Sequence, residues 1–376
     1  MDNFASRHVP ELDGLRGVAI LSVLIHHQLT PFLLQGGFLG VDLFFVLSGF
    51  LITGLLLAEF EKTKSISLRN FYMRRLLRLG PALVLYLLAC IVVTHQTQAI
   101  LLTRQLKLIG LALVYATNWR MAFGWDTSLD PTAIIWSLSI EEQFYLVWPL
   151  VFFACLFLRI RVRYIAIGLA LAILMIFVHR YRLLNAGAEF TRLYYGTDTR
   201  ADALLVGCLT ALIPVKNLVI TPKRWLGILS IVLTGCLIYA MMVVGFTDRF
   251  LYQGGFTFIA LLCASLVFIS AYYQPKTLGL VLGWAPLRWL GRISYGLYLW
   301  HWLIVRNTSF YTLGKFEPWA RLALGLAIAS ASFYLVERPF NKLKYRFSTP
   351  NSKAEASSCA PDTEPTLPAL AVPVTN

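Results

Sequence analysis

Long apolar stretches alternate with short polar ones along most of the chain. A helix needs about 20 mostly apolar residues to cross a bilayer, and ten stretches come near that length. An eleventh stretch, 106–117, is apolar but shorter. The pattern predicts an all-α polytopic membrane protein with about ten transmembrane helices. The predicted spans are 12–30, 38–58, 79–96, 134–158, 164–179, 201–215, 225–245, 254–271, 293–306 and 319–337.

Composition and the distribution of basic residues sharpen this picture. Hydrophobic residues make up 58% of the chain and charged residues 14%, whereas soluble proteins carry about 25% charged residues. Cytoplasmic loops are enriched in Lys and Arg. Counting 106–117 as a span would place the cluster Arg159–Arg163 outside the cell. We therefore expect both termini in the cytoplasm, a plasma (inner) membrane location, and 106–117 as an outer-face or re-entrant helix.

Net charge and cysteine spacing argue against other classes of protein. We interpret the net charge of +14 as basic cytoplasmic loops that meet anionic membrane lipids, and not as a nucleic-acid surface. The cysteines are scattered without a Cys-x-x-Cys pair or a Cys/His cluster, so neither a metal site nor a disulfide framework is predicted. Residues 348–376 are rich in Pro, Ser, Thr and Ala, and predict a disordered tail after a membrane domain of residues 1–347.

The first predicted span contains charged groups that are unusual at membrane depth. Arg16 and His27 are eleven residues apart, which is about three helical turns and roughly 16 Å along the axis, so they share one helix face. Because such groups are costly inside a bilayer, the pair indicates a functional site. The alternative is a snorkelling Arg near the interface and a His that caps the far end.

A second basic pair precedes the third predicted span. Arg75 and Arg78 are three residues apart on a helix, so their guanidinium groups share a face at the cytoplasmic membrane surface. Such a pair suits multidentate binding of phosphate. An ordinary basic flank of a transmembrane helix is the alternative. The pattern Arg-Leu-Leu-Arg-Leu-Gly-Pro runs straight into the span and favours binding.

The fourth predicted span carries two adjacent acids. It opens with Trp136, followed by Ser139, Glu141 and Glu142, and the acids lie about two turns inside the expected outer boundary. A structural ion pair with an arginine is one interpretation. A carboxylate at that depth can also orient a histidine and stabilise its protonated form.

Three further stretches place polar groups in apolar surroundings. Asp42 lies near the outer end of the second span, whose small residues predict close helix packing. Arg200 and Asp202 open the sixth span and are expected to form a local structural pair. Tyr298 and His301 in the ninth span are either interfacial anchors or substrate contacts.

Taken in order, these stretches resemble the acyltransferase-3 family of integral membrane acyltransferases. The resemblance covers most of residues 10–340 and rests on motif order and spacing, since each motif alone is weak. The motifs are Leu-Asp-Gly-Leu-Arg-Gly with a His eleven residues after the Arg, Gly-Val-Asp-Leu-Phe-Phe-Val-Leu-Ser-Gly-Phe-Leu-Ile-Thr, Arg-x-x-Arg, Trp-Ser-Leu-Ser-Ile-Glu-Glu-Gln-Phe-Tyr, Arg-x-Asp-x-Leu, Ser-Tyr-x-x-Tyr-Leu-Trp-His and a closing Glu-x-Pro.

The resemblance implies transfer of an acyl group, usually acetyl from acetyl-CoA, to a carbohydrate hydroxyl. The signature pairs of the family fall on Arg16 with His27 and on Arg75 with Arg78. We expect the three arginines to bind acyl-CoA from the cytoplasm. The expected acceptor is a cell-surface carbohydrate or glycolipid on the outer side.

Two catalytic routes remain open at His27. It acts either as general base on the acceptor hydroxyl or as a covalent acyl carrier. Glu141, preferred over Glu142 on the family pattern, is expected to hold the imidazole and offset its positive charge. The positions expected to bind substrate or support the site are Asp13, Asp42, Trp136, Ser139, Glu142, Arg200, Asp202, Tyr298 and His301.

A secondary transporter of a small solute is the alternative function. Intramembrane charges, small-residue packing and the short spans 164–179 and 201–215 suit a transport pathway. The sequence has no evident inverted repeat and no pair of broken helices in matching halves. We therefore favour the enzyme.

Overall fold

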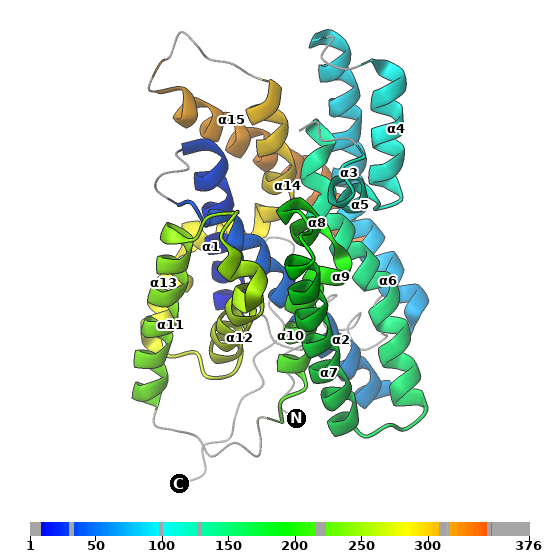
Figure 1. The fold of residues 1–376 in the computed structure, drawn as a ribbon, viewed down its shortest axis with the longest axis vertical. Helices are drawn as coiled ribbons and strands as arrows, with labels where there is room; N and C mark the ends of the chain where they lie inside the picture. Colours follow the sequence, from blue (N-terminus) through cyan, green and yellow to red (C-terminus); the bar gives the residue numbers. More distant parts are fainter. Residues whose placement is uncertain are drawn as a thin grey trace.

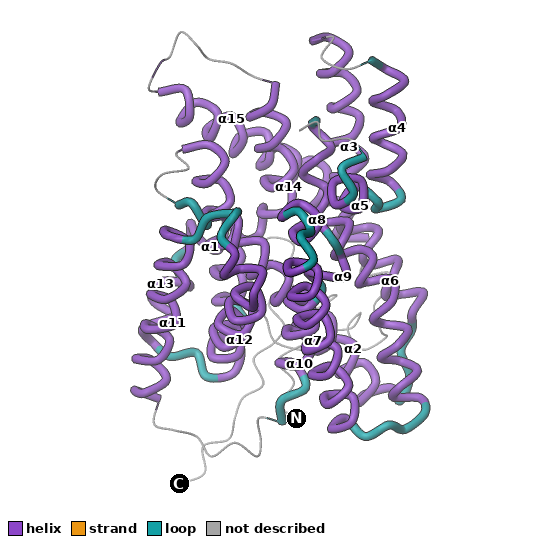
Figure 2. Tube along the Cα trace, viewed as in Figure 1, coloured by secondary structure: helices purple, strands orange, loops and turns teal. Residues whose placement is uncertain are grey.

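The structure, a computed structural model, describes residues 9–29, 34–97, 101–125, 130–214, 223–307, 314, 316–343 and 347. The expected tail 348–376 and the first eight residues lie outside these ranges. Within them every regular element is helical, as Figure 2 shows, so the prediction of an all-α fold is confirmed.

The helices follow one another with short connections, and Figure 1 labels most of them. A π-helical turn, Ile25–Leu29, continues α1, and another, Phe333–Glu337, continues α15. The α-helices are α1 Pro10–Leu24, α2 Gly40–Thr63, α3 Leu68–Thr97, α4 Leu102–Leu113, α5 Thr117–Ala122, α6 Trp136–Phe157, α7 Val162–Asn185, α8 Phe190–Tyr195, α9 Thr197–Arg200, α10 Asp202–Ala211, α11 Lys223–Val243, α12 Phe256–Tyr272, α13 Lys276–Leu282, α14 Ala285–Asn307, α15 Glu317–Ser332 and α16 Arg338–Leu343.

Seven helical segments in the described ranges are long and apolar enough to cross a membrane. The predicted spans around α1, α10 and α14 are helical as well. However, α1 has 15 residues and α10 has 10, and α14 contains three arginines. A total of ten spans therefore stays a prediction. The seven segments are Gly37–Thr63, Leu68–Gln96, Pro131–Phe157, Val162–Asn185, Trp225–Val243, Leu251–Tyr272 and Glu317–Leu343.

The outward faces of these helices are apolar, as a lipid environment requires. On α7, Leu171 is 58% exposed and Met175 is 68% exposed. On α11, Ile231 and Val232 are exposed as well. Together with the seven segments, these faces indicate a multi-pass membrane protein.

Two predicted boundaries differ from the structure. The third span was expected to begin at residue 79, but α3 begins at Leu68, because arginine and leucine favour helix. Pro81 lies inside α3 and does not end it. Proline is tolerated within membrane helices because neighbouring helices and side chains can satisfy the backbone groups that it leaves without a hydrogen bond. The fifth span was expected to be short, yet α7 has 24 residues.

Close backbone approaches at glycine set the positions of the central helices. A Cβ on Gly49 of α2 would lie 1.9 Å from the carbonyl oxygen of Leu204 on α10. A Cβ on Gly291 of α14 would lie 1.9 Å from the carbonyl oxygen of Asp13 on α1. These approaches bring α1 against α14 and α2 against α10, and they confirm the predicted small-residue packing of the second span.

Candidate active site

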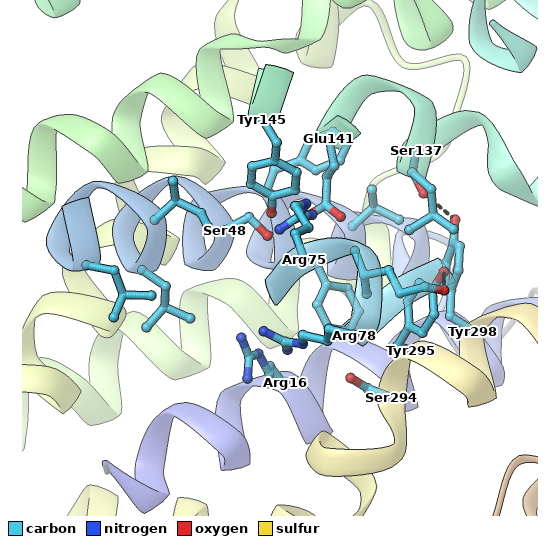
Figure 3. A pocket seen from close by; sticks show the side chains of 18 residues that line it. Arg16, Ser48, Arg75, Arg78, Ser137, Glu141, Tyr145, Ser294, Tyr295 and Tyr298 are labelled. Atoms are coloured by element: carbon cyan, nitrogen blue, oxygen red, sulfur yellow. Dashed lines mark hydrogen bonds between the residues drawn. The ribbon is translucent and has the colours of Figure 1, made fainter. Parts of the chain in front are cut away.

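A cavity of about 300 Å³ lies between α1, α2, α3, α6 and α14. Its polar lining residues come from all five helices, and Figure 3 shows their side chains turned toward one space. The remaining lining residues are mostly apolar. The polar or aromatic lining residues labelled in the figure are Arg16, Ser48, Arg75, Arg78, Ser137, Glu141, Tyr145, Ser294, Tyr295 and Tyr298.

The three arginines predicted to bind acyl-CoA meet at this cavity. Arg16 comes from α1, whereas Arg75 and Arg78 come from one face of α3. Figure 3 shows the guanidinium groups of Arg16 and Arg78 in the same space. The continuous helix through Leu68–Thr97 is what aims Arg75 and Arg78 together, because residues three apart share a helix face.

The arginines differ in how tightly other side chains hold them. Arg75 forms an ion pair with Glu142 at 2.8 Å, and its guanidinium lies 3.0 Å from the centre of the Tyr145 ring. Arg16 is 3.7 Å from Asp13, a loose pair, and Arg78 is exposed toward the cavity. Arg75 is thus held in place, while Arg16 and Arg78 keep donors available to a ligand.

The two adjacent acids of α6 have different roles in the structure. Glu141 lines the cavity and accepts a hydrogen bond of 2.5 Å from the hydroxyl of Ser48 on α2. Glu142 lies outside the cavity lining and binds Arg75. Successive helix positions point about 100° apart, which explains why one acid faces the cavity and its neighbour braces an arginine.

His27 has a different neighbour from the one that we predicted. Its Nδ1 lies 3.1 Å from Nε2 of His301 on α14, and the two rings stack at 5.3 Å with an interplanar angle of 17°. The ring of Trp302 meets His27 edge-on at 5.2 Å. Since Glu141 is engaged by Ser48, the geometry makes His301, and not Glu141, the hydrogen-bond partner of His27.

One tyrosine connects the cavity to the histidine pair. Tyr298 lines the cavity and shares a hydrogen bond of 2.7 Å with Ser137, which also lines it. On its other side the Tyr298 ring lies 5.8 Å from the ring of His301. Tyr298 therefore contacts both the arginine cavity and the histidine pair. The expected Tyr298 and His301 positions lie at the site, where Tyr298 borders the cavity and His301 contacts His27.

Arg200 and Asp202 do not pair with each other, so that prediction was wrong. Arg200 binds Asp42 of α2 at 3.0 Å, and Asp202 binds Arg180 of α7 at 2.9 Å. Thr257 of α12 donates to the same carboxylate of Asp202. Arg200 ends α9 and Asp202 begins α10, and their side chains point to different helices. These residues hold α2, α7, α10 and α12 together away from the cavity lining.

Trp136 and Ser139 also lie outside the cavity lining. Trp136 packs against Tyr194 and Tyr195 of α8. The Ser139 hydroxyl donates to the carbonyl oxygen of Ile135 in its own helix. In this arrangement neither side chain lines the cavity, and a supporting role for them stays a prediction. The serine of that motif that reaches the cavity is Ser137.

Among the cavity residues labelled in Figure 3, sequence reasoning missed five: Ser48, Ser137, Tyr145, Ser294 and Tyr295. Each lies within a stretch that carries a predicted site residue. Helical spacing offered a signal for four of them. Ser137 and Tyr145 lie four residues before and after Glu141, and Ser294 and Tyr295 lie four and three residues before Tyr298, so they share the faces of predicted residues. Ser48 had no such signal.

Comparisons with known proteins identify acyltransferases. A family model described as an acyltransferase domain matches residues 9–337. The putative peptidoglycan O-acetyltransferase YrhL of Bacillus subtilis is 37% identical over 360 residues, which cover 90% of this chain and 56% of that protein. The peptidoglycan O-acetyltransferase OatA of Listeria monocytogenes is 35% identical over 366 residues, covering 90% and 57%.

A third relative extends the same pattern. The O-acetyltransferase OatA of Staphylococcus aureus is 35% identical over 369 residues, covering 91% of this chain and 59% of that protein. The chain thus spans less than two thirds of the length of these relatives. No solved structure matches the chain significantly.

Proposed function

Because the chain belongs to the acyltransferase-3 family, we propose that it is an integral membrane O-acyltransferase. It transfers an acyl group, acetyl by default, from acyl-CoA to a hydroxyl group of a cell-surface carbohydrate or glycolipid. The observation that carries this proposal is the convergence of Arg16, Arg75 and Arg78 on one cavity bordered by a tyrosine, Tyr298, whose ring contacts His301, the partner of His27. The names of the relatives make peptidoglycan the first acceptor to assay.

The arginine cavity is the donor site. Three guanidinium groups suit the phosphates of CoA, since charge-assisted hydrogen bonds to phosphate are strong and often bidentate. Each such bond contributes about 1.5–3 kcal/mol. A volume of about 300 Å³ is at the lower end for ligand pockets, so the cavity suits a phosphate-bearing part of acyl-CoA and not the whole molecule.

His27 performs the chemistry in this proposal. It takes the proton of the acceptor hydroxyl, the hydroxyl oxygen bonds to the thioester carbonyl carbon, and the carbon–sulfur bond breaks. The imidazolium then returns the proton to the thiolate of CoA. In the covalent route, Nε2 of His27 attacks the thioester carbonyl carbon and the CoA thiolate leaves. The acceptor hydroxyl then attacks the acyl group on His27, the bond from that carbon to Nε2 breaks, and the hydroxyl proton passes to the thiolate. Burial of the His301 side chain and the aromatic rings of Tyr298 and Trp302 support a water-poor site.

The proposal also has a direction across the membrane. Basic loops favour a cytoplasmic side for Arg75 and Arg78, where acyl-CoA is available. His27 lies near the C-terminal end of the segment that carries Arg16, which favours an acceptor that enters from the outer side. Both termini would then be cytoplasmic in a plasma (inner) membrane.

The first test is transfer by purified protein in lipid nanodiscs. Wild-type protein is given acetyl-labelled acetyl-CoA and a muropeptide acceptor, and esterified label is measured. His27→Ala is expected to lower transfer about 10²- to 10⁴-fold while acetyl-CoA binding persists. The matched control is His95→Ala, an exposed histidine outside the cavity lining.

Two results would overturn the proposal. Wild-type transfer by His27→Ala at equal expression removes the catalytic role. Solute flux through reconstituted protein that is independent of acetyl-CoA, together with no transfer, favours the transporter.

A further inference from the structure

A hydrogen bond to the backbone fixes one proton of His301. Its Nδ1 lies 3.0 Å from the carbonyl oxygen of Leu297, one turn earlier in α14. A carbonyl oxygen can only accept, so Nδ1 of His301 carries a proton and donates it. The proton positions of both rings follow from such partners.

The other nitrogen of His301 is an acceptor. The His301 side chain is fully buried. Its hydrogen-bond partners among the described residues are a backbone carbonyl and the imidazole of His27, neither of which is a carboxylate. A buried charge without a counter-ion is costly, so His301 is neutral. Its Nε2 therefore keeps a lone pair, and that lone pair faces Nδ1 of His27 at 3.1 Å.

This arrangement determines the tautomer of His27. Two lone pairs facing each other would repel, so Nδ1 of His27 must be protonated and donate to His301. A neutral imidazole has one ring proton, so Nε2 of His27 keeps its lone pair. Within the described part of the chain, Nε2 of His27 has no hydrogen-bond partner, and it is free to receive a proton from a substrate.

The surrounding rings hold this geometry. His27 and His301 stack nearly parallel, and Trp302 closes one side of His27. The indole nitrogen of Trp302 donates to the carbonyl oxygen of Asp130 at 3.1 Å, which anchors the ring. His27 lies in the π-helical turn Ile25–Leu29, and such turns often occur at functional sites.

We propose that His301 is a positioning residue that fixes His27 in the tautomer with a basic Nε2. The chain of hydrogen bonds runs from His27 through His301 to the Leu297 carbonyl, and it does the orienting work that a carboxylate does in hydrolytic triads. This inference rests on the proposed function of His27. Both routes at His27 need the same lone pair, because Nε2 either takes the acceptor proton or attacks the thioester carbonyl carbon.

The kinetic test compares two substitutions of His301 with opposite hydrogen-bonding properties. Glutamine places an amide oxygen near the former Nε2 and can still accept from His27, whereas phenylalanine keeps the ring but cannot accept. We expect His301→Phe to lower kcat for acetyl transfer about 10²- to 10³-fold, with KM for acetyl-CoA changed less than about threefold. His301→Gln should recover to within about tenfold of wild type. His179→Gln, on α7 beside Asp198, is the matched control.

The spectroscopic test measures the tautomer directly and does not depend on activity. Protein labelled with ¹⁵N-histidine is studied by NMR, and His27 is assigned by its loss in His27→Gln. In wild type, Nε2 of His27 should give an unprotonated signal and Nδ1 a protonated one. In His301→Phe the His27 signals should shift toward a mixture of tautomers.

The outcomes separate this inference from the proposed function. A protonated Nε2 of His27 in wild type overturns the inference, and so does equal, full activity of both His301 variants. If His301→Phe does not fold, the wild-type NMR signals and His301→Gln still decide. If the tautomer is as stated but His27→Ala keeps wild-type transfer, the proposed function fails and the positioning of His27 by His301 stands.

Discussion

Two groups of arginines and carboxylates lie between the helices, and they differ in how their charges are matched. In the first group, Arg200 binds Asp42 and Arg180 binds Asp202, with N–O distances of 3.0 and 2.9 Å and side chains at most 1% exposed. We name these four residues the buried ion-pair group. In the second group, at the cavity, Arg16 is 3.7 Å from its nearest carboxylate and 22% exposed.

This difference suggests how to distinguish charged residues that stabilise the fold from charged residues that can bind a ligand. A buried pair on neighbouring helices contributes packing and specificity, and neither Arg180 nor Arg200 lines the cavity. Loosely held arginines that face a cavity keep their donors for an anion. Both groups carry intramembrane charges, so the residue types alone do not reveal which group binds a substrate.

The largest expected effect comes from removing one partner of the buried ion-pair group. Arg180→Met leaves the carboxylate of Asp202 buried without its cation, which costs about 3–5 kcal/mol. We expect a large fall in the midpoint of thermal unfolding in detergent. Arg182→Met, an exposed arginine on the same helix, is the control and should change stability by less than about 0.5 kcal/mol. Equal stability of the two variants would show that the pair is not structural.

Replacing both partners of one pair should be less harmful than replacing one. Asp42→Leu with Arg200→Met removes both charges together, so neither is left without a partner. A double-mutant cycle on unfolding should give a coupling energy of about 1–3 kcal/mol in favour of the double variant. If the two single effects add, the charges act independently and the comparison fails for this pair.

The two adjacent acids of α6 show the same contrast between a paired charge and a charge at the cavity. Glu142 is matched by Arg75 at 2.8 Å, whereas Glu141 meets a hydroxyl and borders the cavity. We expect Glu141→Gln to lower acetyl transfer about tenfold, because it changes the electrostatic field at the proposed donor site. Glu142→Gln can still accept from Arg75 and should change transfer less than about threefold. The reverse order would assign the active carboxylate to Glu142.

The smallest effect on stability is expected at Asp198, a half-exposed carboxylate that belongs neither to the buried ion-pair group nor to the cavity. Burial raises the pKa of Asp198, but hydrogen bonds from Arg192 and His179 outweigh it, and the pKa lies below its ordinary value. A lowered folded pKa gives stability that is present above the unfolded pKa of about 4 and is lost as the pH falls through the folded value.

Asp198→Asn should therefore be less stable than wild type at pH 7 by less than about 1 kcal/mol, because the group is exposed enough for solvent screening. The gap should close as the pH falls below about 4. Thermal unfolding of both proteins between pH 7 and pH 3.5 measures it. A gap that widens toward acid would reverse the sign of this contribution.

Local patterns predicted the helices well. Apolar stretches marked the positions of α2, α6, α11 and α12 to within a few residues of their observed bounds. They failed at α3, where the basic segment before residue 79 is also helical. Apolar content predicts which part of a helix lies in lipid, whereas helix propensity decides where the helix begins. Arginine has a high helix propensity but is not apolar, so the basic start of α3 is helical without belonging to an apolar stretch.

The sequence did not predict which side chains on different helices contact each other. Residues 27 and 301 are 274 positions apart, so no local spacing links His27 to His301. For the same reason the neighbours Arg200 and Asp202 were expected to pair, although each binds a residue of another helix. Arg16, Arg75 and Arg78 meet at one cavity. The three-residue spacing placed Arg75 and Arg78 on one helix face, but no spacing linked them to Arg16 on another helix.

We propose that the arginines at the cavity bind acyl-CoA, and titration calorimetry measures this binding. Acetyl-CoA is titrated into purified wild type, Arg75→Ala/Arg78→Ala, and the control Arg69→Ala/Arg74→Ala, which removes two positive charges from the same helix outside the cavity lining. We predict that the first variant raises Kd about 100-fold or more, given about 1.5–3 kcal/mol per charged hydrogen bond, while the control stays within about threefold. Unchanged binding by Arg75→Ala/Arg78→Ala would contradict the account.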